Sequence, residues 1–146
     1  MSTQILEDRF ELEKPLSHTD FGTVYLACDR RYQHRPQCLV TAISYHQRQI
    51  RHHLEREVQV LEQLGHHPQV PTVLAYFHSD NTFYWVQEKI IGHPLSQEIT
   101  RGKALSEGYV TKLLQDVLTG LIAIHAQGVV HQNLQPQHLL RQAASG

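Results

Sequence analysis

The sequence contains few cysteines, no large excess of either charge and no long apolar run. Its two cysteines, Cys28 and Cys38, cannot cross-link a secreted scaffold of 146 residues, so we expect reduced thiols. The formal net charge of −1 gives no electrostatic reason for binding nucleic acid. No apolar stretch approaches the roughly 18–20 residues of a membrane-spanning helix, and the first residues lack the apolar core of a signal peptide. We therefore expect a cytoplasmic protein with no nucleic-acid or membrane partner.

Histidine is the residue type that stands out, with 12 copies that include the pairs His52-His53 and His66-His67. Zinc sites on helices usually take their ligands from one face, for example two histidines four positions apart. Adjacent histidines point in different directions, and no cysteine pair accompanies them. We therefore expect solvated histidines and no bound metal, with a histidine-rich metal binder as a minor alternative.

The first half of the chain has the pattern of an antiparallel sheet with one inserted helix. Alternating or short apolar segments between turn residues predict five strands. They are Phe10–Glu13, Gly22–Cys28, Gln37–Ser44, Thr72–Phe77 and Phe83–Glu88. Apolar residues recur every three or four positions from Ile50 to Leu64, which predicts a helix that ends at Gly65. The turn Ser79-Asp80-Asn81 is expected to join the last two strands.

The second half of the chain has a helical period from Gly92 onwards. A short helix is predicted over Leu95–Thr100, and a long one from Ser106, which can act as an N-cap, to Gln127. Two further apolar segments are expected to be short and buried, Val129–His131 and Leu139–Leu140. Five strands with one inserted helix, followed by more helices, indicate an α+β fold.

Four segments and one glutamate resemble the motifs of protein kinases. Residues 16–25 (L-S-H-T-D-F-G-T-V-Y) resemble the glycine-rich loop L-G-x-G-x-F-G-x-V-Y, and residues 41–44 resemble the third-strand motif V-A-I-K. Residues 84–92 look like the hinge, and residues 131–140 (H-Q-N-L-Q-P-Q-H-L-L) are similar to the catalytic loop H-R-D-L-K-P-E-N-L-L. Glu57 stands where the regulatory helix carries its glutamate. The chain thus resembles bacterial serine/threonine kinases of the eukaryotic type over about Phe10 to Leu140.

This resemblance implies an architecture and a nucleotide pocket. Residues 1–91 would form the kinase N-lobe, a five-stranded antiparallel sheet plus one helix. Residues 92–146 would form the first helices and the catalytic-loop region of the C-lobe. The pocket would consist of Leu16, Gly22, Val24, Ala42, Ser44, Glu88, Ile90 and Leu140. The alternative is a packed core at these positions, so we expect no cofactor and keep ATP binding as an alternative.

The glycine loop and the third strand depart from the family pattern. Among the loop glycines only Gly22 remains. The motif match places Ser44 at the lysine that holds the phosphates, whereas a shifted alignment places Thr41 there at the cost of the Ala-Ile match. A hydroxyl cannot replace that cation under either alignment. Glu57 would be the lysine's partner, or else a carboxylate that is solvated or paired locally.

The catalytic loop departs further from the pattern. The resemblance places Asn133 at the general base, Gln135 at the lysine that steadies the phosphate and His138 at a metal-binding asparagine. An amide cannot act as a general base, and an imidazole is a poor ligand for Mg²⁺. The chain also reaches Gly146 without a D-F-G segment. We therefore expect no intact catalytic residue and no enzymatic activity.

The resulting expectation is an inactive kinase-like module with a regulatory or protein-binding role. The long helix, residues 106–127, should leave an apolar face wet at Leu114, Val117, Leu121 and Ile124. Such a face indicates a protein partner or self-association, because burying it is worth roughly 25 cal/mol per Å². The alternative is a truncated or decayed serine/threonine kinase fragment with residual ATP binding, or one half of a split kinase.

Overall fold

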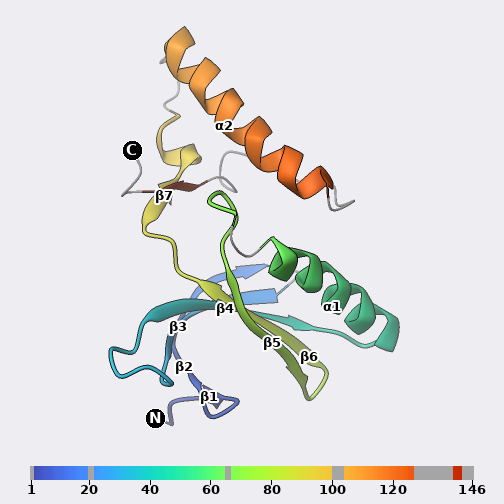
Figure 1. The fold of residues 1–146 in the computed structure, drawn as a ribbon. Helices are drawn as coiled ribbons and strands as arrows, with labels where there is room; N and C mark the ends of the chain where they lie inside the picture. The colour runs from blue at the N-terminus through green and yellow to red at the C-terminus, as the bar shows by residue number, and fades with distance from the viewer. Residues whose placement is uncertain (1, 20–21, 65–66, 100–103, 127–139, 143–146) are drawn as a thin grey trace. The chain divides into compact units, whose positions relative to one another are not determined.

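A computed structural model describes residues 2–19, 22–64, 67–99, 104–126 and 140–142. The chain divides into unit 1, Met1–Lys89, and unit 2, Ile90–Gly146. Unit 1 contains a sheet and one helix, whereas unit 2 contains a two-stranded ladder and the long helix (Figure 1). This α+β composition confirms the predicted fold class.

The sheet of unit 1 has six antiparallel strands in the order β1-β2-β3-β4-β6-β5. The strands are β1 (Ile5–Leu6), β2 (Phe10–Thr19), β3 (Gly22–Asp29), β4 (Gln37–Ser44), β5 (Val73–Ser79) and β6 (Thr82–Glu88). Five of them confirm the predicted strands. Strand β1 was not predicted, because two residues are too few to show an alternating pattern. It pairs with β2 across a turn in which Glu7 and Asp8 have positive φ.

The turn between β5 and β6 confirms the prediction for this segment. Only two residues connect the strands, and Asp80 and Asn81 have φ angles of 50° and 60°. Asp and Asn tolerate this left-handed conformation better than other residues with a side chain. Two successive positive φ angles are typical of a type I′ turn, whose twist matches that of the flanking strands.

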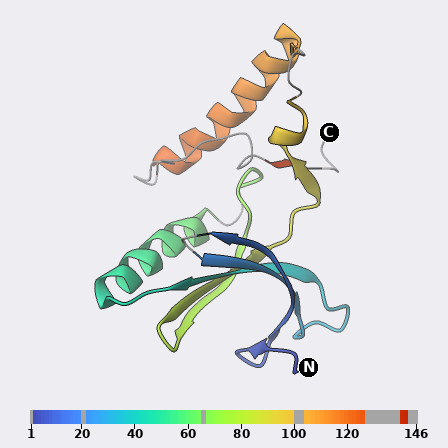
Figure 2. The same cartoon turned by 180° about the vertical axis from the view of Figure 1, so that it is seen from behind.

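The two faces of the sheet are covered by different groups. One face carries the buried cluster Leu6, Phe10, Ala27, Cys38, Val40 and Val86. The other face carries Phe83, which clusters with Tyr45 and with Val58 of helix α1 (Arg48–Gln63). Figures 1 and 2, which view the molecule from opposite sides, both show α1 lying along the sheet. We call the α1 side the helix face and the opposite side the core face.

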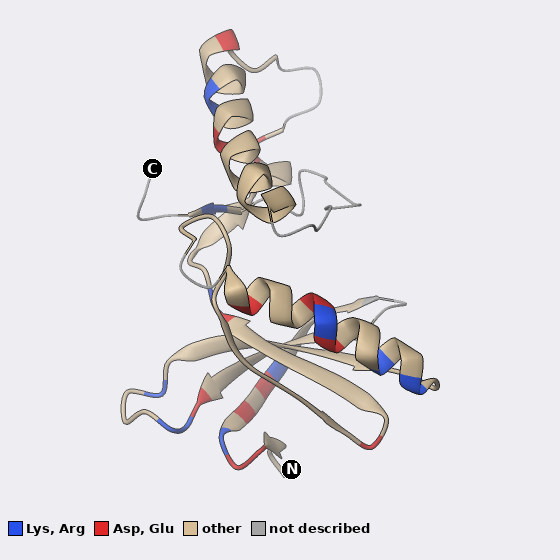
Figure 3. Ribbon diagram, turned by 45° about the vertical axis from the view of Figure 1, so that its right-hand side comes forward, with Lys and Arg blue, Asp and Glu red and all other residues tan. Residues whose placement is uncertain are grey.

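Helix α1 confirms the helix predicted from residue 50 onwards. Val58 is 2% exposed and Leu64 is buried, whereas Ile50 in the first turn is 42% exposed. Complete burial of one such aliphatic side chain contributes about 1.5–3 kcal/mol. Acidic and basic residues are both present along the helix, between uncharged ones (Figure 3). Gly65, the predicted end, lies outside the described residues.

Unit 2 begins with a strand that pairs with a segment from the far end of the unit. Its elements are β7 (Gly92–Pro94), the 3-10 turn η1 (Leu95–Gln97), helix α2 (Glu107–Ala126) and β8 (Leu140–Gln142). Strands β7 and β8 are antiparallel, and a Cβ on Gly92 would lie 2.0 Å from the carbonyl oxygen of Arg141. A helix was predicted over Leu95–Thr100, but its described part forms only the single 3-10 turn η1. Neither short strand was predicted, because three residues carry no readable period.

Helix α2 confirms the long helix and its predicted cap. The backbone N–H of Tyr109 donates to Oγ of Ser106 at 3.2 Å, which satisfies one of the free donors at the helix start. The helix is described as far as Ala126. Among the described residues, no helix is both long enough and apolar enough to cross a membrane.

The exposed apolar residues of α2 differ from those predicted. Leu114, Leu118 and Ile122 are 54%, 56% and 69% exposed, and their four-residue spacing makes one stripe. Of the other residues predicted to be wet, Val117, Leu121 and Ile124 are half-buried. Figure 3 shows that the charges of α2 lie in its first half. We call Leu114, Leu118 and Ile122 the α2 stripe.

The prediction of a buried segment at Leu139–Leu140 is wrong for the residue that is described. Leu140 is 51% exposed. It belongs to a ladder of two strands, which buries less side-chain surface than a wider sheet does. Val129–His131 lie outside the described residues.

Candidate functional site

A row of side chains crosses the helix face beside the hairpin that resembles a glycine-rich loop. Ser17 pairs with Val24, Val24 with Thr41, and Thr41 with Trp85. Directly opposed residues of antiparallel strands project from the same face, and Trp85 packs against Phe83 on the helix face. Val24, Thr41 and Trp85 are half-buried, and Ser17 is exposed. The row therefore alternates two hydroxyl side chains, Ser17 and Thr41, with the apolar side chains of Val24 and Trp85.

Gly22 brings the β2–β3 hairpin close to strand β4. A Cβ at this position would lie 2.3 Å from the carbonyl oxygen of Ala42 and 3.1 Å from Cγ1 of Ile43. Only glycine allows this approach without moving a backbone. Close packing against β4 thus explains why glycine occupies position 22. The resemblance implies a second explanation, a loop that approaches phosphate groups.

The register of β4 separates residues that were predicted to line one pocket. Ala42 is opposite Thr23 and Tyr84, and Tyr84 packs against the cluster on the core face. Successive strand residues alternate between faces, so Ala42 and Ser44 project away from the face that carries Val24. Thr41 shares the helix face with Val24. This register favours Thr41 over Ser44 as the position of the family's lysine.

The remaining predicted pocket residues lie in three different places. Leu16 is 49% exposed and lies at a bulge of β2, between Pro15 and Ser17. At the end of β6, the carboxylate of Glu88 accepts a hydrogen bond from the Thr72 N–H at 3.0 Å. Ile90 and Leu140 belong to unit 2. A pocket that joins residues of both units stays a prediction.

Glu57 is paired on its own helix. Its Oε1 lies 3.1 Å from Nε2 of His53, one turn earlier, and its side chain is 58% exposed. Of the alternatives for this glutamate, the structure favours a carboxylate that is paired locally. Glu55 is the more covered acid, with a side chain 28% exposed and 3.6 Å from Nε of Arg51.

The predicted catalytic-loop residues Asn133, Gln135 and His138 lie outside the described residues. Their side chains therefore enter no geometric argument. In the described part of the chain, no cluster of three or more His, Cys, Asp or Glu side chains is arranged to hold a metal ion.

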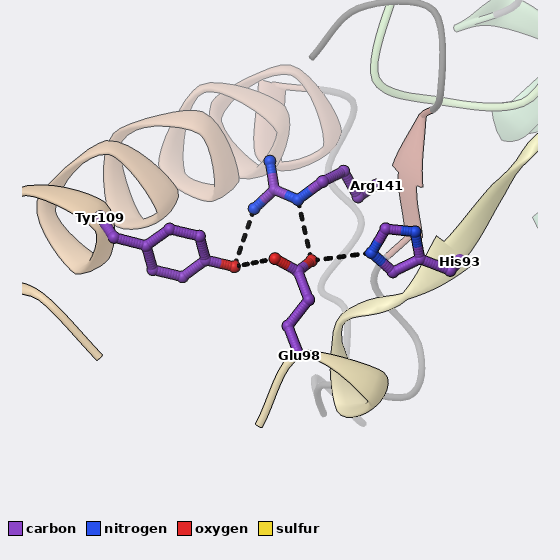
Figure 4. Close-up of polar contacts among 4 residues, drawn as sticks. All are labelled: His93, Glu98, Tyr109 and Arg141. Carbon is purple, nitrogen blue, oxygen red and sulfur yellow. Dashed lines mark hydrogen bonds and ion pairs between the residues drawn. The ribbon is translucent and has the colours of Figure 1, made fainter. Parts of the chain in front are cut away.

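Unit 2 contains a polar cluster that the sequence did not predict, centred on the carboxylate of Glu98 (Figure 4). Oε1 of Glu98 accepts a hydrogen bond from the hydroxyl of Tyr109 at 2.6 Å. Oε2 accepts one from Nε of Arg141 at 2.8 Å and lies 3.1 Å from Nε2 of His93. Nη2 of Arg141 also donates to the Tyr109 hydroxyl at 2.9 Å. We call these four residues the Glu98 cluster.

The environment of Glu98 strongly favours its ionised form. The hydrogen bond from Tyr109, and then that from Arg141, lowers the pKa of Glu98 to about 2. The side chains of Glu98 and Arg141 are 23% and 30% exposed, so water reaches this pair only in part. The four residues come from three separate segments, and no spacing in the sequence connects them.

Comparison with known proteins finds protein kinases among the proteins to which this chain is similar. Residues 10–145 match the description of the protein kinase domain. Serine/threonine-protein kinase B of Synechocystis sp. is 35% identical over 142 residues, which cover 93% of this chain and 25% of that protein. Serine/threonine-protein kinase PknA of Nostoc sp. is 30% identical over 150 residues, which cover 98% of this chain and 27% of that protein. The chain spans about a quarter of the length of these relatives.

A solved structure shows the same fold. The kinase domain of Mycobacterium tuberculosis PknI superposes with a TM-score of 0.80 at 18% identity. The match covers 98% of this chain and 58% of that structure. The predicted kinase-like fold is thus confirmed.

The comparisons contradict the prediction that the chain is not an enzyme, because the relatives are named serine/threonine protein kinases. That prediction relied on the lack of a lysine at Ser44 or Thr41, on the residues aligned with the catalytic loop and on the missing D-F-G segment. The register favours Thr41 over Ser44, and the catalytic-loop side chains lie outside the described residues.

Proposed function

Because this chain belongs to the protein kinase family, we propose that it forms the nucleotide-binding part of a serine/threonine protein kinase. ATP would be the phosphoryl donor and a protein hydroxyl the acceptor. The observation that carries the proposal is the row Ser17–Val24–Thr41 on the helix face, next to the close approach of Gly22 to β4.

The chemistry of this row suits a nucleotide. Val24 offers a half-buried apolar surface for a base, and the hydroxyls of Ser17 and Thr41 can donate to sugar or phosphate oxygens. Phosphoryl transfer depends mainly on positioning and on neutralising charge at the phosphates. A nucleotide held against this row would have its phosphates near the hairpin that carries Gly22.

The two alignments of β4 provide a direct test. Introducing a lysine by Thr41→Lys adds a cation on the helix face, whereas Ser44→Lys adds the same cation on the core face. We expect Thr41→Lys to tighten ATP binding by about tenfold, the worth of one charge-assisted hydrogen bond. Ser44→Lys should change the dissociation constant less than about twofold. Calorimetric titration of both variants with Mg·ATP measures the difference.

Three outcomes of this titration are informative. Tighter binding for Thr41→Lys alone supports both the pocket and the register. Tighter binding for Ser44→Lys alone would show that the nucleotide lies on the core face. No saturable binding by the unmodified chain or by either variant would overturn the proposal.

A second proposal concerns the α2 stripe, which we propose binds a protein surface. Leu114, Leu118 and Ile122 are exposed within unit 2, and no Lys, Arg, Asp or Glu occurs in α2 after Asp116. Monomeric proteins rarely leave such aligned apolar residues wet. The partner of best chemical fit is another apolar helix, such as one from a further part of a kinase domain.

The oligomeric state tests this second proposal. Replacing all three residues of the α2 stripe by serine should abolish association with a peptide or subunit that carries an apolar helix, and should lower dye binding. Ile91→Ser is a suitable control, because Ile91 is 74% exposed but does not belong to α2. Sedimentation velocity with both variants decides the matter. Equal behaviour of the two variants would argue against a docking role for the stripe.

A further inference from the structure

The Glu98 cluster joins three elements of unit 2 through one carboxylate. His93 belongs to β7, Tyr109 lies in the first turn of α2, and Arg141 belongs to β8, while Glu98 directly follows η1. Each of the three partners approaches a carboxylate oxygen within 3.1 Å (Figure 4). The contacts thus tie both strands of the ladder and the start of the long helix to a single side chain.

The ladder itself supplies a reason for a carboxylate at this place. His93 and Arg141 lie directly opposite each other in the β7–β8 pairing, and both contact Oε2 of Glu98. Directly opposed side chains of a strand pair lie close enough for one carboxylate to contact both. The carboxylate of Glu98 thus accepts a charge-assisted hydrogen bond from Arg141 on one strand and contacts the imidazole of His93 on the other. A ladder of three residue pairs has little stability of its own, so it depends on such a contact.

The two strands of the ladder are adjacent in sequence to the segments that resemble the catalytic loop and the hinge of a kinase. Arg141 directly follows residues 131–140, which resemble the catalytic loop, and Gly92 ends the segment that resembles the hinge. Strand β8 therefore begins at Leu140, the last residue of the segment that resembles the catalytic loop. Its partner β7 begins where the hinge segment ends.

We infer that Glu98 is a positioning residue of the kinase, which acts through Arg141 to hold β8 against β7 and so places the end of the catalytic-loop segment. The inference rests on the proposed function where it concerns phosphate transfer. It does not require Glu98 to touch ATP or the acceptor protein. The hydroxyl of Tyr109 completes the arrangement, because it donates to Glu98 and accepts from Arg141.

Hydrogen exchange in the full chain tests the structural step. Glu98→Gln keeps the shape of the side chain and removes its charge, and we expect it to speed amide exchange in β7 and β8 by about tenfold or more. Asp116→Asn is the matched control, because Asp116 forms an exposed ion pair with Lys112 on α2 at 2.8 Å. That control should change exchange in the ladder by less than about twofold. Tyr109→Phe, which removes one hydroxyl, should give a smaller increase and provides a milder variant if Glu98→Gln does not fold.

Kinetics distinguish positioning from a general loss of stability. Glu98→Gln should lower kcat for phosphate transfer by about tenfold and leave KM for ATP within about twofold, since the proposed nucleotide row belongs to unit 1. Arg141→Lys keeps the charge but gives up the planar fork that reaches both Glu98 and Tyr109. It should retain more activity than Arg141→Met. Equal activity of the two Arg141 variants would contradict a role for the ion pair.

The outcomes for the two proposals can be separated. Unchanged exchange of β7 and β8 in both Glu98→Gln and Tyr109→Phe overturns the inference. If neither the unmodified chain nor its Thr41→Lys and Ser44→Lys variants bind Mg·ATP, the proposed function fails. Faster exchange of the ladder in Glu98→Gln would then still support the holding role of Glu98, and unchanged exchange would still overturn it.

Discussion

Arg9 donates two hydrogen bonds to the carboxylate of Asp29, from Nε to Oδ1 at 2.9 Å and from Nη2 to Oδ2 at 2.7 Å. Asp29 is completely buried, and the side chain of Arg9 is 19% exposed. The N–H of Arg31 donates to the same carboxylate at 3.1 Å. This pair connects the residue before β2 with the end of β3. The start of β2 and the end of β3 are therefore held together by a buried charge with hydrogen-bond partners at both of its oxygens.

Asp29→Asn should destabilise unit 1. The variant leaves the Arg9 guanidinium without a counter-charge, and breaking a buried ion pair in this way costs about 3–5 kcal/mol. Because Arg9 retains some contact with water, we expect a loss of about 2–4 kcal/mol in the free energy of unfolding. Urea unfolding followed by the fluorescence of Trp85, the single tryptophan, measures it.

Asp80→Asn is the control for this substitution. Asp80 is exposed, and its positive φ suits asparagine equally well. We expect a change below about 0.5 kcal/mol. Comparable losses in both variants would mean that the Arg9–Asp29 pair contributes no more to the free energy of unfolding than an exposed aspartate does.

The contribution of Asp29 should disappear in acid. The hydrogen bond from Arg9 holds the pKa of Asp29 below its ordinary value, against the opposing effect of burial. A carboxyl group with a lowered pKa in the folded state stabilises the fold above its unfolded pKa of about 3.9. This stabilisation is lost as the pH falls through the folded-state pKa. The stability difference between the unmodified chain and Asp29→Asn should therefore shrink below about pH 4. A difference that stays constant down to the acid transition would contradict this assignment.

Gly22→Ala should weaken the sheet, whereas Gly108→Ala should not. The added methyl group at position 22 meets a backbone oxygen 2.3 Å away, so β3 and β4 must separate locally. We expect a loss of about 1–3 kcal/mol. A methyl group at Gly108 meets nothing within 4 Å, and alanine in a helix is favoured by about 0.5–1 kcal/mol. Calorimetric melting of the two variants should show shifts of opposite sign.

Cys38 should resist alkylation in the folded protein. Its side chain is completely buried, and burial raises the pKa of the thiol to about 12. Because the thiolate is the reactive form, labelling by iodoacetamide near neutral pH should be at least about a hundredfold slower than in denaturant. Mass spectrometry of labelled peptides measures both rates. Rapid labelling of Cys38 without denaturant would show that β4 opens more readily than its packing indicates.

The sequence predicted the long elements well because their patterns extend over many residues. Helix α1 and the five longer strands follow this rule. The faces of β4 were not predictable, since residues 38–43 (C-L-V-T-A-I) are all small or apolar apart from one threonine. Such a run does not show which side is buried. The motif match therefore grouped Ala42 with Val24, and only the pairing with Thr23 and Tyr84 separates them.

The Glu98 cluster was not predictable for a different reason. Its members come from β7, from the position after η1, from α2 and from β8, and each residue is ordinary at its own place in the sequence. Their meeting depends on the β7–β8 ladder, which sets Arg141 opposite His93. Strands of three residues are too short to be recognised by alternation. A contact of this kind becomes visible only with the tertiary structure.

The β7–β8 ladder also determines an order of events during synthesis. Gly92 pairs with Gln142, so β7 leaves the ribosome long before its partner strand exists. At about 5–20 residues per second, the delay is about 2–10 seconds. Throughout this interval Gly92–Pro94 is an open edge that a chaperone or a foreign strand can occupy. Slowing translation within the codons for α2 should therefore increase misassembly of unit 2 and leave unit 1 unaffected.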